Sequence, residues 1–163
     1  MYGMDRVNLI LRNKKYQEYI NKIKKAEENR IFCLHNMSHF MDVARIAYSI
    51  NLVEGLEIPK ELIYATALLH DIGRFKQYED GTPHELASAE LAPEILEETG
   101  FEEPEQEEIL RGIREHRNKD VAREGNLAGI IYRADKLSRP CFACEAEKQC
   151  DWKKSRKNMR ISY

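Results

Sequence analysis

The segment Leu68-Leu69-His70-Asp71-Ile72-Gly73-Arg74 places two adjacent polar side chains at the end of an apolar run. The run from Ile63 to Leu69 carries no charge, which is typical of a helix buried in a protein core. Burying His70 and Asp71 at the end of such a helix costs free energy unless both side chains find partners. A satisfied polar pair is one solution. Since neutral imidazole and carboxylate both bind divalent cations, a metal site is the other.

Helical periodicity recurs on both sides of this segment. Apolar residues repeat at helical spacing over residues 5–28, 36–53, 83–99, 104–116 and 126–138, and Pro59 is placed to open the helix that ends at His70. Residues 72–81 lack this spacing, so we expect a loop there. No alternating strand pattern of useful length occurs. The sequence therefore predicts an all-α fold of about six helices.

Length and composition predict one globular domain. The chain has 163 residues, of which 33% are charged and 42% hydrophobic. We expect a single domain over residues 1–163, with its core at about 30–139 and an irregular tail that contains cysteines at 140–163. The net charge of −2 argues against bulk electrostatic binding to nucleic acid or to an anionic membrane.

The N-terminal residues lack the basic-then-apolar pattern of a signal peptide, and no apolar run approaches the length of a membrane span. These features predict a cytoplasmic protein with no membrane partner. Thiols stay reduced in the cytoplasm. The four cysteines are therefore expected to be free thiols or metal ligands rather than disulfides.

Further polar residues fall on the apolar faces or at the ends of other predicted helices. They are His39, His84, His116 and Asp135. Each has an ordinary alternative role, such as a hydrogen-bonded core histidine for His39 or an ion pair with Arg139 for Asp135. Helical bundles, however, build metal sites from ligands that several helices direct into one cavity. Taken together with His70 and Asp71, the set favours a metal centre.

Three motifs connect this pattern with a known family. They are His39-x-x-x-Val43-Ala44, Ala67-Leu68-Leu69-His70-Asp71-Ile72-Gly73-Arg74 and Tyr132-Arg133-Ala134-Asp135-Lys136. Their order and spacing, from about residue 36 to 139, resemble the H…HD…D signature of the HD-domain metal-dependent phosphohydrolases. The resemblance implies an HD-domain helical bundle in which the metal ligands are His39, His70, Asp71 and Asp135.

His84 and His116 resemble the additional ligands of binuclear members of that family. Together with residues 130–136 they make the chain similar to the bacterial YqeK branch, which hydrolyses diadenosine tetraphosphate. That branch usually has Thr after the histidine that His116 matches, whereas this chain has Arg117. The resemblance implies two divalent transition-metal ions (Fe, Mn, Co or Zn) with Asp71 as their bridge.

The resemblance also implies an enzyme that cleaves a phosphoester or phosphoanhydride of a small phosphorylated molecule, with a nucleotide as the expected substrate class. A metal-activated water would attack phosphorus, so Asp71 would act through the metals and no protein nucleophile is expected. His35 lies one turn before His39 and is a candidate for proton transfer to the leaving group. An exposed or capping histidine is its alternative role.

Cations next to the candidate ligands could bind the substrate phosphate. They are Arg74, Lys136 and Arg139, and a solvated helix end is the alternative for each. Two other functions also fit the sequence. One is a mononuclear nucleotide monophosphatase, and the other is a non-catalytic HD module that senses metal or redox state or binds a partner. The sequence is compatible with an oligomer.

The cysteines have a spacing of their own. Cys141-x2-Cys144-x5-Cys150 lies in the tail, and Cys33 lies six residues before His39. If Cys33 and the tail meet, these four thiols could form a second metal site that holds zinc or an iron–sulfur cluster. The alternative is a set of free, partly buried thiols that pack the tail against the domain.

Overall fold

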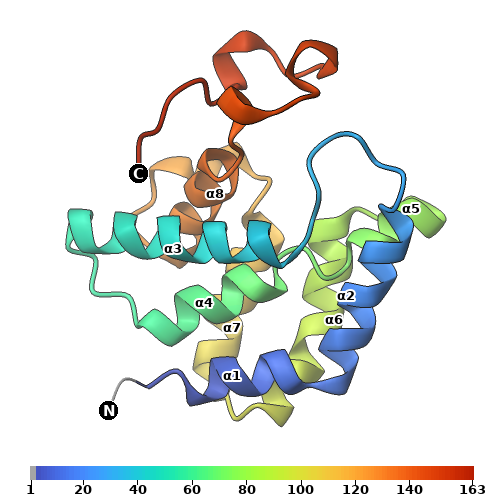
Figure 1. The fold of residues 1–163 in the computed structure, drawn as a ribbon. Helices are drawn as coiled ribbons and strands as arrows, with labels where there is room; N and C mark the ends of the chain where they lie inside the picture. The colour runs from blue at the N-terminus through green and yellow to red at the C-terminus, as the bar shows by residue number, and fades with distance from the viewer. Residues whose placement is uncertain (1–2) are drawn as a thin grey trace.

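A computed structural model describes residues 3–163 (Figure 1), and every regular element in this range is a helix. The α-helices are α1 (Asp5–Arg12), α2 (Lys14–Ala26), α3 (Met37–Glu54), α4 (Lys60–Leu69), α5 (Arg74–Asp80), α6 (His84–Glu98), α7 (Glu103–Glu115) and α8 (Leu127–Leu137). The predicted all-α class is confirmed. No helix in this range is both long enough and apolar enough to cross a membrane.

Helix α4 forms the centre of the bundle. It packs against α3, α7, α8 and α1, and Figure 1 shows it beneath α3 in the middle of the molecule. Seven of its ten residues are buried, including Ile63, Leu68 and Leu69. Since α4 is enclosed along its length, the residues that follow it, His70 and Asp71, emerge in the interior rather than at the surface.

The segment predicted as one helix over residues 5–28 is two helices. The chain turns at Asn13, whose ψ of 129° is extended, and its side chain accepts a hydrogen bond from the Tyr16 N–H at 3.0 Å. Asn is favoured at such N-cap positions because its side-chain oxygen accepts a backbone N–H that has no partner within the helix. The break lets α1 and α2 contact different parts of the bundle.

The prediction of a loop over residues 72–81 is wrong, because Arg74–Asp80 forms α5. This short helix is held by one apolar anchor, Phe75, whose ring is buried and stacks on Tyr19 of α2 at a centroid distance of 5.6 Å. A single anchor leaves no periodic apolar pattern to detect. Gly81 ends the helix with φ +80°, a conformation that glycine adopts without strain.

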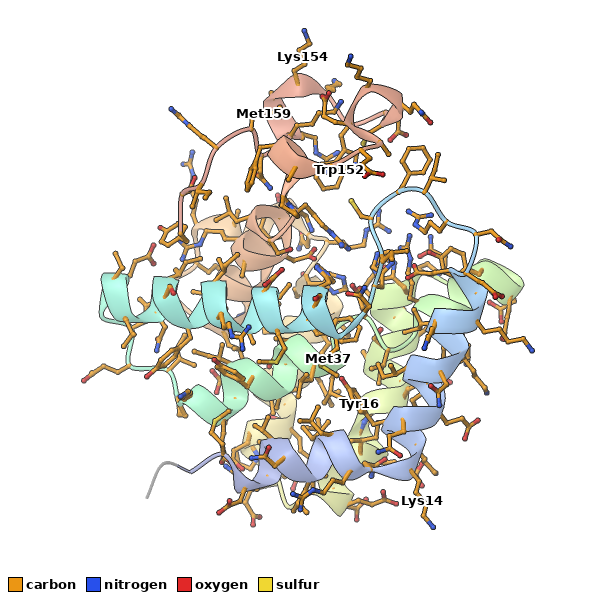
Figure 2. The ribbon with its side chains drawn as sticks, in the orientation of Figure 1. Lys14, Tyr16, Met37, Trp152, Lys154 and Met159 are labelled. Atoms are coloured by element: carbon orange, nitrogen blue, oxygen red, sulfur yellow. The ribbon has the colours of Figure 1, made fainter. Side chains whose placement is uncertain are left out.

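Residues 140–163 form an irregular tail, as expected. It contains three one-turn 3₁₀ helices, Cys141–Ala143, Glu147–Gln149 and Lys154–Arg156. Figure 1 shows the tail above α8, beside the loop that joins α2 to α3. In Figure 2, Trp152 lies on the side of the tail that faces this loop, whereas Lys154 points away from the molecule.

Candidate metal centre

Three helix ends bring the first set of predicted ligands together. His70 ends α4, His39 lies in the first turn of α3, and Asp135 lies in the last turn of α8. Asn36 caps α3 by accepting the His39 N–H at 3.1 Å, which sets where that turn begins. One ligand atom from each of these residues and from Asp71 lies within 4.8 Å of the others.

The two carboxylates of this set face the two imidazoles. Asp71 Oδ2 lies 3.1 Å from His70 Nε2 and 3.4 Å from His39 Nε2. Asp135 Oδ1 lies 3.6 Å and 3.3 Å from the same two nitrogen atoms. Four donor atoms thus surround one point.

The other oxygen of Asp71 belongs to a second set. Asp71 Oδ1 lies 3.3 Å from His84 Nε2 and 3.4 Å from His116 Nε2. These two nitrogen atoms are 3.1 Å apart. His84 opens α6 and His116 ends α7, so a second pair of helices supplies this set. Asp71 is therefore the one residue shared by both groups of ligand atoms.

Each of the four histidines is held through its Nδ1 atom. The Nδ1 atom contacts Ala67 O at 2.6 Å in His70, Ile113 O at 2.6 Å in His116 and Ser138 Oγ at 3.2 Å in His39. In His84 it contacts Gln77 Oε1 at 2.6 Å and Arg74 Nη1 at 2.8 Å. A hydrogen bond at Nδ1 fixes the ring orientation and leaves Nε2 to face the site, as in histidines that bind metals.

Several atoms at the centre of this arrangement lack hydrogen-bond partners among the described residues. They are His39 Nε2, His70 Nε2 and Asp71 Oδ1. His70 is fully buried and Asp71 is 2% exposed, so leaving these atoms unpaired is costly. A divalent cation would satisfy all three, and the nitrogen and carboxylate donors suit one. The residues therefore fit a metal centre.

The electrostatics of the second set favour a neutral histidine. Burial lowers the pKa of His84 to about 3; Asp71 opposes this effect, and the positive charges near His84, including Arg74 and Arg117, add to it. His84 is therefore unprotonated at neutral pH. A neutral imidazole has the free lone pair that metal binding needs.

The carboxylates behave differently. Burial alone would raise the pKa of Asp71, but the surrounding histidines lower it well below its ordinary value. The same holds for Asp135, where Lys136 is the main opposing charge. Both side chains are thus anionic and concentrate negative charge at the site.

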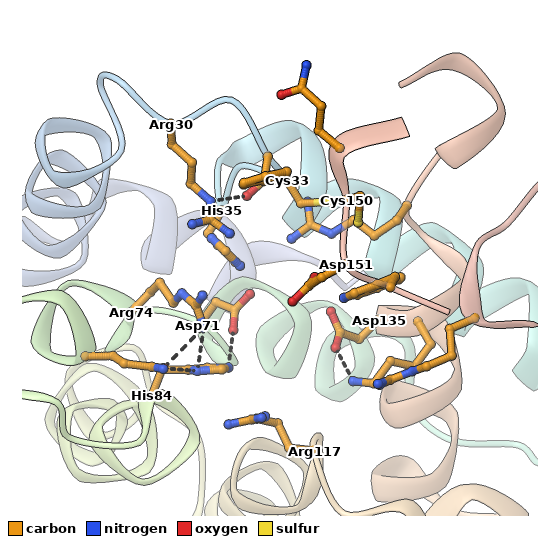
Figure 3. A pocket seen from close by; sticks show the side chains of 17 residues that line it. Arg30, Cys33, His35, Asp71, Arg74, His84, Arg117, Asp135, Cys150 and Asp151 are labelled. Atoms are coloured by element: carbon orange, nitrogen blue, oxygen red, sulfur yellow. Dashed lines mark hydrogen bonds and ion pairs between the residues drawn. The ribbon is translucent and has the colours of Figure 1, made fainter. Parts of the chain in front are cut away.

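A pocket of about 590 Å³ opens directly above these ligands (Figure 3). The three cations predicted to bind phosphate, Arg74, Lys136 and Arg139, all line it. Lys136 Nζ also lies 2.7 Å from Asp135 Oδ2, the oxygen that faces away from the histidines. Arg139 Nη1 donates to the Leu34 carbonyl at 2.6 Å.

His35 also lines this pocket, and the structure adds a partner that sequence reasoning missed. Glu27 Oε2 lies 2.5 Å from His35 Nδ1, and the other oxygen, Oε1, accepts the His35 backbone N–H at 2.7 Å. Tyr78 donates its hydroxyl to the same carboxylate at 2.6 Å. Glu27 sits at the end of an amphipathic helix, where a glutamate gives no sign of burial.

Other residues at the site were also missed. They are Gln77, Arg30, Arg117, Arg156, Phe32 and Trp152, all of which line the pocket. Gln77 lies on α5, in the segment for which the sequence predicts a loop. Of these residues, only Trp152 stands out in the sequence, because it is the one tryptophan in the chain.

The family model for the HD domain matches residues 36–139 of this sequence, the span that contains His39, the His70–Asp71 pair and Asp135. The chain belongs to the HD-domain family. The resemblance seen in the sequence is thereby confirmed at the level of the family. The YqeK branch within it stays a prediction.

Two proteins are similar to this HD-domain protein over nearly its whole length. An uncharacterized protein of Clostridium beijerinckii is 50% identical over 160 residues, which cover 98% of this chain and all of that protein. A crystal structure of a predicted HD superfamily hydrolase from an uncultured Thermotogales bacterium superposes with a TM-score of 0.61 at 25% identity, covering 94% of this chain and 87% of that one.

Ribonuclease Y of Mesoplasma florum is 30% identical over 122 residues. The match covers 75% of this chain but only 22% of ribonuclease Y. The HD-domain protein described here therefore spans about a fifth of that relative's length.

Proposed function

We propose that this HD-domain protein is a metal-dependent phosphohydrolase with two metal ions, acting on a nucleotide. The observation that carries the proposal is the position of Asp71. One of its oxygen atoms faces His39 and His70, the other faces His84 and His116, and a basic pocket opens above them.

The first ion would be held by His39, His70, Asp71 and Asp135, and the second by Asp71, His84 and His116. Bound divalent cations would supply an activated water and offset the negative charge that develops on a phosphoryl group during hydrolysis. The donors are nitrogen and carboxylate oxygen without thiolate, a set that Fe, Mn, Co and Zn all accept.

The pocket walls would bind the phosphate groups. Six cationic side chains line it, namely Arg30, Arg74, Arg117, Lys136, Arg139 and Arg156, against the carboxylates of Asp71, Asp135 and Asp151. Two bound divalent cations would make the pocket strongly positive. A substrate with more than one phosphate group would use these separate cations best.

The aromatic residues of the pocket favour a nucleotide over a plain phosphoester. Phe32 and Trp152 line the same cavity as the cations, from the loop before α3 and from the tail. Any nucleobase can stack on an aromatic ring, because every base has a flat π-face. Stacking there would place the phosphates towards Asp71.

His35 is the candidate for proton transfer to the leaving group. Its Nδ1 atom is engaged by Glu27, which orients the ring, and the ring lines the pocket. An imidazole held in this way can accept a proton at Nε2 and return it to an oxygen atom. Glu27 is then a positioning residue, because it acts through His35.

The test is a substrate screen on protein purified without oxygen, with metal content measured on the same sample. Dinucleoside polyphosphates, nucleoside di- and triphosphates, nucleoside monophosphates and a short oligoribonucleotide would be compared. We expect about two ions per chain and turnover of the polyphosphates. Asp71→Ala should abolish both, whereas Asp120→Ala, at an exposed position, should keep both.

The outcomes separate the competing functions. One ion per chain with turnover only of monophosphates would replace the proposal with a mononuclear phosphatase. Turnover only of the oligoribonucleotide would indicate the activity named for ribonuclease Y. Absence of transition metal together with unchanged hydrolysis in Asp71→Ala would refute the proposal.

A further inference from the structure

The four cysteines line one cavity, which also reaches His39 at the edge of the histidine–aspartate centre. Cys33, from the loop between α2 and α3, lines a cavity of about 400 Å³ together with Cys141, Cys144 and Cys150 from the tail. All four are free thiols and half-buried. Two segments more than a hundred residues apart thus direct every cysteine of the chain to the same place.

The local backbone places the tail cysteines on one side. Cys141–Ala143 is a 3₁₀ turn in which the Cys144 N–H donates to the Cys141 carbonyl at 3.2 Å. Side chains three residues apart eclipse each other in such a turn, so Cys141 and Cys144 share a face. A second 3₁₀ turn, Glu147–Gln149, then leads to Cys150, whose N–H donates to the Ala146 carbonyl at 3.0 Å.

Cys33 lies close to all three. Burial raises the pKa of its thiol, Arg139 opposes that rise, and negative charge on each of the tail cysteines raises it further. Figure 3 shows Cys33 and Cys150 on facing segments at the rim of the catalytic pocket. All four cysteines therefore lie around one cavity, although they come from two distant parts of the sequence.

The tail has little else to hold it. Among residues 140–163 the one buried apolar side chain is Ala146, while Phe142 is 48% and Ile161 76% exposed. Hydrogen bonds of Asn158 to the carbonyls of Lys136 and Arg139 join one point of the tail to α8. One buried apolar side chain contributes little free energy against the entropy of ordering an irregular segment of this length. A metal centre would supply the missing free energy.

The spacing of the sulfur atoms argues against a single zinc ion. A single zinc ion with Zn–S bonds of about 2.3 Å draws its four sulfur atoms to within about 3.8 Å of each other. Within residues 3–163 the ligand groups whose atoms all lie within 4.8 Å are the two histidine–aspartate sets, and no three cysteines form such a group. In an iron–sulfur cluster, each cysteine thiolate binds its own iron atom, or two thiolates bind the same iron atom. The four cysteine sulfur atoms are therefore further apart than around a single zinc ion.

We propose that the four cysteines bind an iron–sulfur cluster, which fastens residues 140–163 to the HD domain. Nearby cations suit the negative charge of a thiolate-ligated cluster. Lys157 is nearly buried and lines the same cavity, where its Nζ donates to the Glu147 carboxylate at 2.9 Å. Cys33, Cys150 and Trp152 line both this cavity and the catalytic pocket, so the cluster would hold one wall of that pocket in place.

The first test is direct analysis of the intact protein, purified without oxygen from iron-supplemented cells. We expect a visible charge-transfer absorption and about two to four equivalents of acid-labile sulfide per chain. Labile sulfide is the decisive quantity, because iron alone could occupy the histidine–aspartate centre. Zinc at the cysteines without labile sulfide, or no metal there at all, would overturn the proposal.

Variants assign the ligands. Cys33→Ser and Cys144→Ser should each lose the sulfide and the visible absorption while the helical circular dichroism of the bundle is retained. Phe142→Ala is the matched control, since Phe142 lies between two of the cysteines with an exposed side chain. It should keep both signals. Sulfide that persists in both cysteine variants would refute the assignment.

Limited trypsin digestion reports on the tail itself. Lys153 and Lys154 are exposed and follow Cys150 closely. Cleavage there should be several-fold faster in Cys144→Ser than in Phe142→Ala, and equal rates would contradict a fastening role. His70→Ala separates this proposal from the proposed function, because that variant should lose hydrolysis yet keep its labile sulfide.

Discussion

The backbone N–H of Gly73 donates to the hydroxyl of Ser88 at 2.9 Å, and the two backbone segments approach so closely there that a Cβ on Gly73 would lie 2.4 Å from the Ser88 nitrogen atom. This contact seats α6 against the turn that follows Asp71. His84 opens α6, so the same contact sets the distance between His84 and Asp71. A backbone approach of this kind is open only to glycine.

Gly73→Ala is expected to damage stability and the second ligand set together. The added methyl group meets backbone atoms that cannot rotate away, so the free energy of unfolding should fall by about 1–3 kcal/mol or more. Chemical denaturation of the metal-free protein measures this loss. Gly3→Ala is the control, because nothing lies within 4 Å of the Cβ it would add. Equal stability of the two variants would contradict the close contact.

Single ligand variants should separate the two ions. His116→Ala removes a residue of the second set only, so we expect one ion per chain to be lost and the other retained. Asp71→Ala belongs to both sets and should lose both. Loss of one cation removes several kcal/mol of charge stabilisation, which corresponds to a fall in kcat of about a hundredfold or more. Metal analysis after desalting checks the stoichiometry, and two ions in Asp71→Ala would exclude a bridging role.

Gln77 should act on the metal through His84. Its Oε1 atom accepts from His84 Nδ1 at 2.6 Å and fixes the ring. Removing such a partner weakens metal binding by about ten- to a hundredfold. We expect this loss in Gln77→Ala and a partial return in Gln77→Glu, which keeps an acceptor. Titration of each variant with a divalent ion measures the metal affinity, and the surface variant Gln17→Ala is the control. Unchanged metal affinity in Gln77→Ala would show that Gln77 does not act through His84.

Glu27 should make stability depend on pH. Burial opposes ionisation of its carboxyl, but contacts with His35 and Tyr78 lower its pKa to about 2. A folded-state pKa below the unfolded value of about 4.3 means that Glu27 stabilises the protein above that pH and loses this contribution as pH falls towards 2. The full contribution is about 2–3 kcal/mol.

Glu27→Gln removes this dependence. The difference in unfolding free energy between the parent protein and Glu27→Gln should therefore be larger at pH 6 than at pH 3. Both proteins are measured after chelation, so the shared response of Asp71 and Asp135 cancels in the difference. A difference that stays constant, or that grows as pH falls, would show that Glu27 is not held as an anion.

Trp152 should contribute to binding of the base and not of the phosphate. Stacking of one base is worth about 1–3 kcal/mol, so Trp152→Ala should raise KM for a nucleotide by about five- to a hundredfold. Trp152→Phe should restore much of the loss. Inorganic pyrophosphate has no base and serves as the control substrate. An equal rise in KM for pyrophosphate would mean that Trp152 shapes the pocket rather than stacking.

The candidate ligands were predictable because their signals are local. His70 and Asp71 follow an apolar run directly, and His39 extends the apolar stripe of its helix. Glu27 and Gln77 gave no such signal, since each looks like a surface residue in its own segment. Their burial arises only where α2, α5 and the loop after α2 pack together, which depends on contacts between residues far apart in the chain.

By itself the sequence determined the all-α class, the HD family and the identity of the six ligand candidates. Helical periodicity and short motifs are properties of neighbouring residues, so they can be recognised without a fold. Only the tertiary structure decided that Asp71 presents one oxygen to each ligand set and that Cys33 meets the tail. These relationships join segments separated by tens of residues or more, and their distances depend on how buried helices pack around α4.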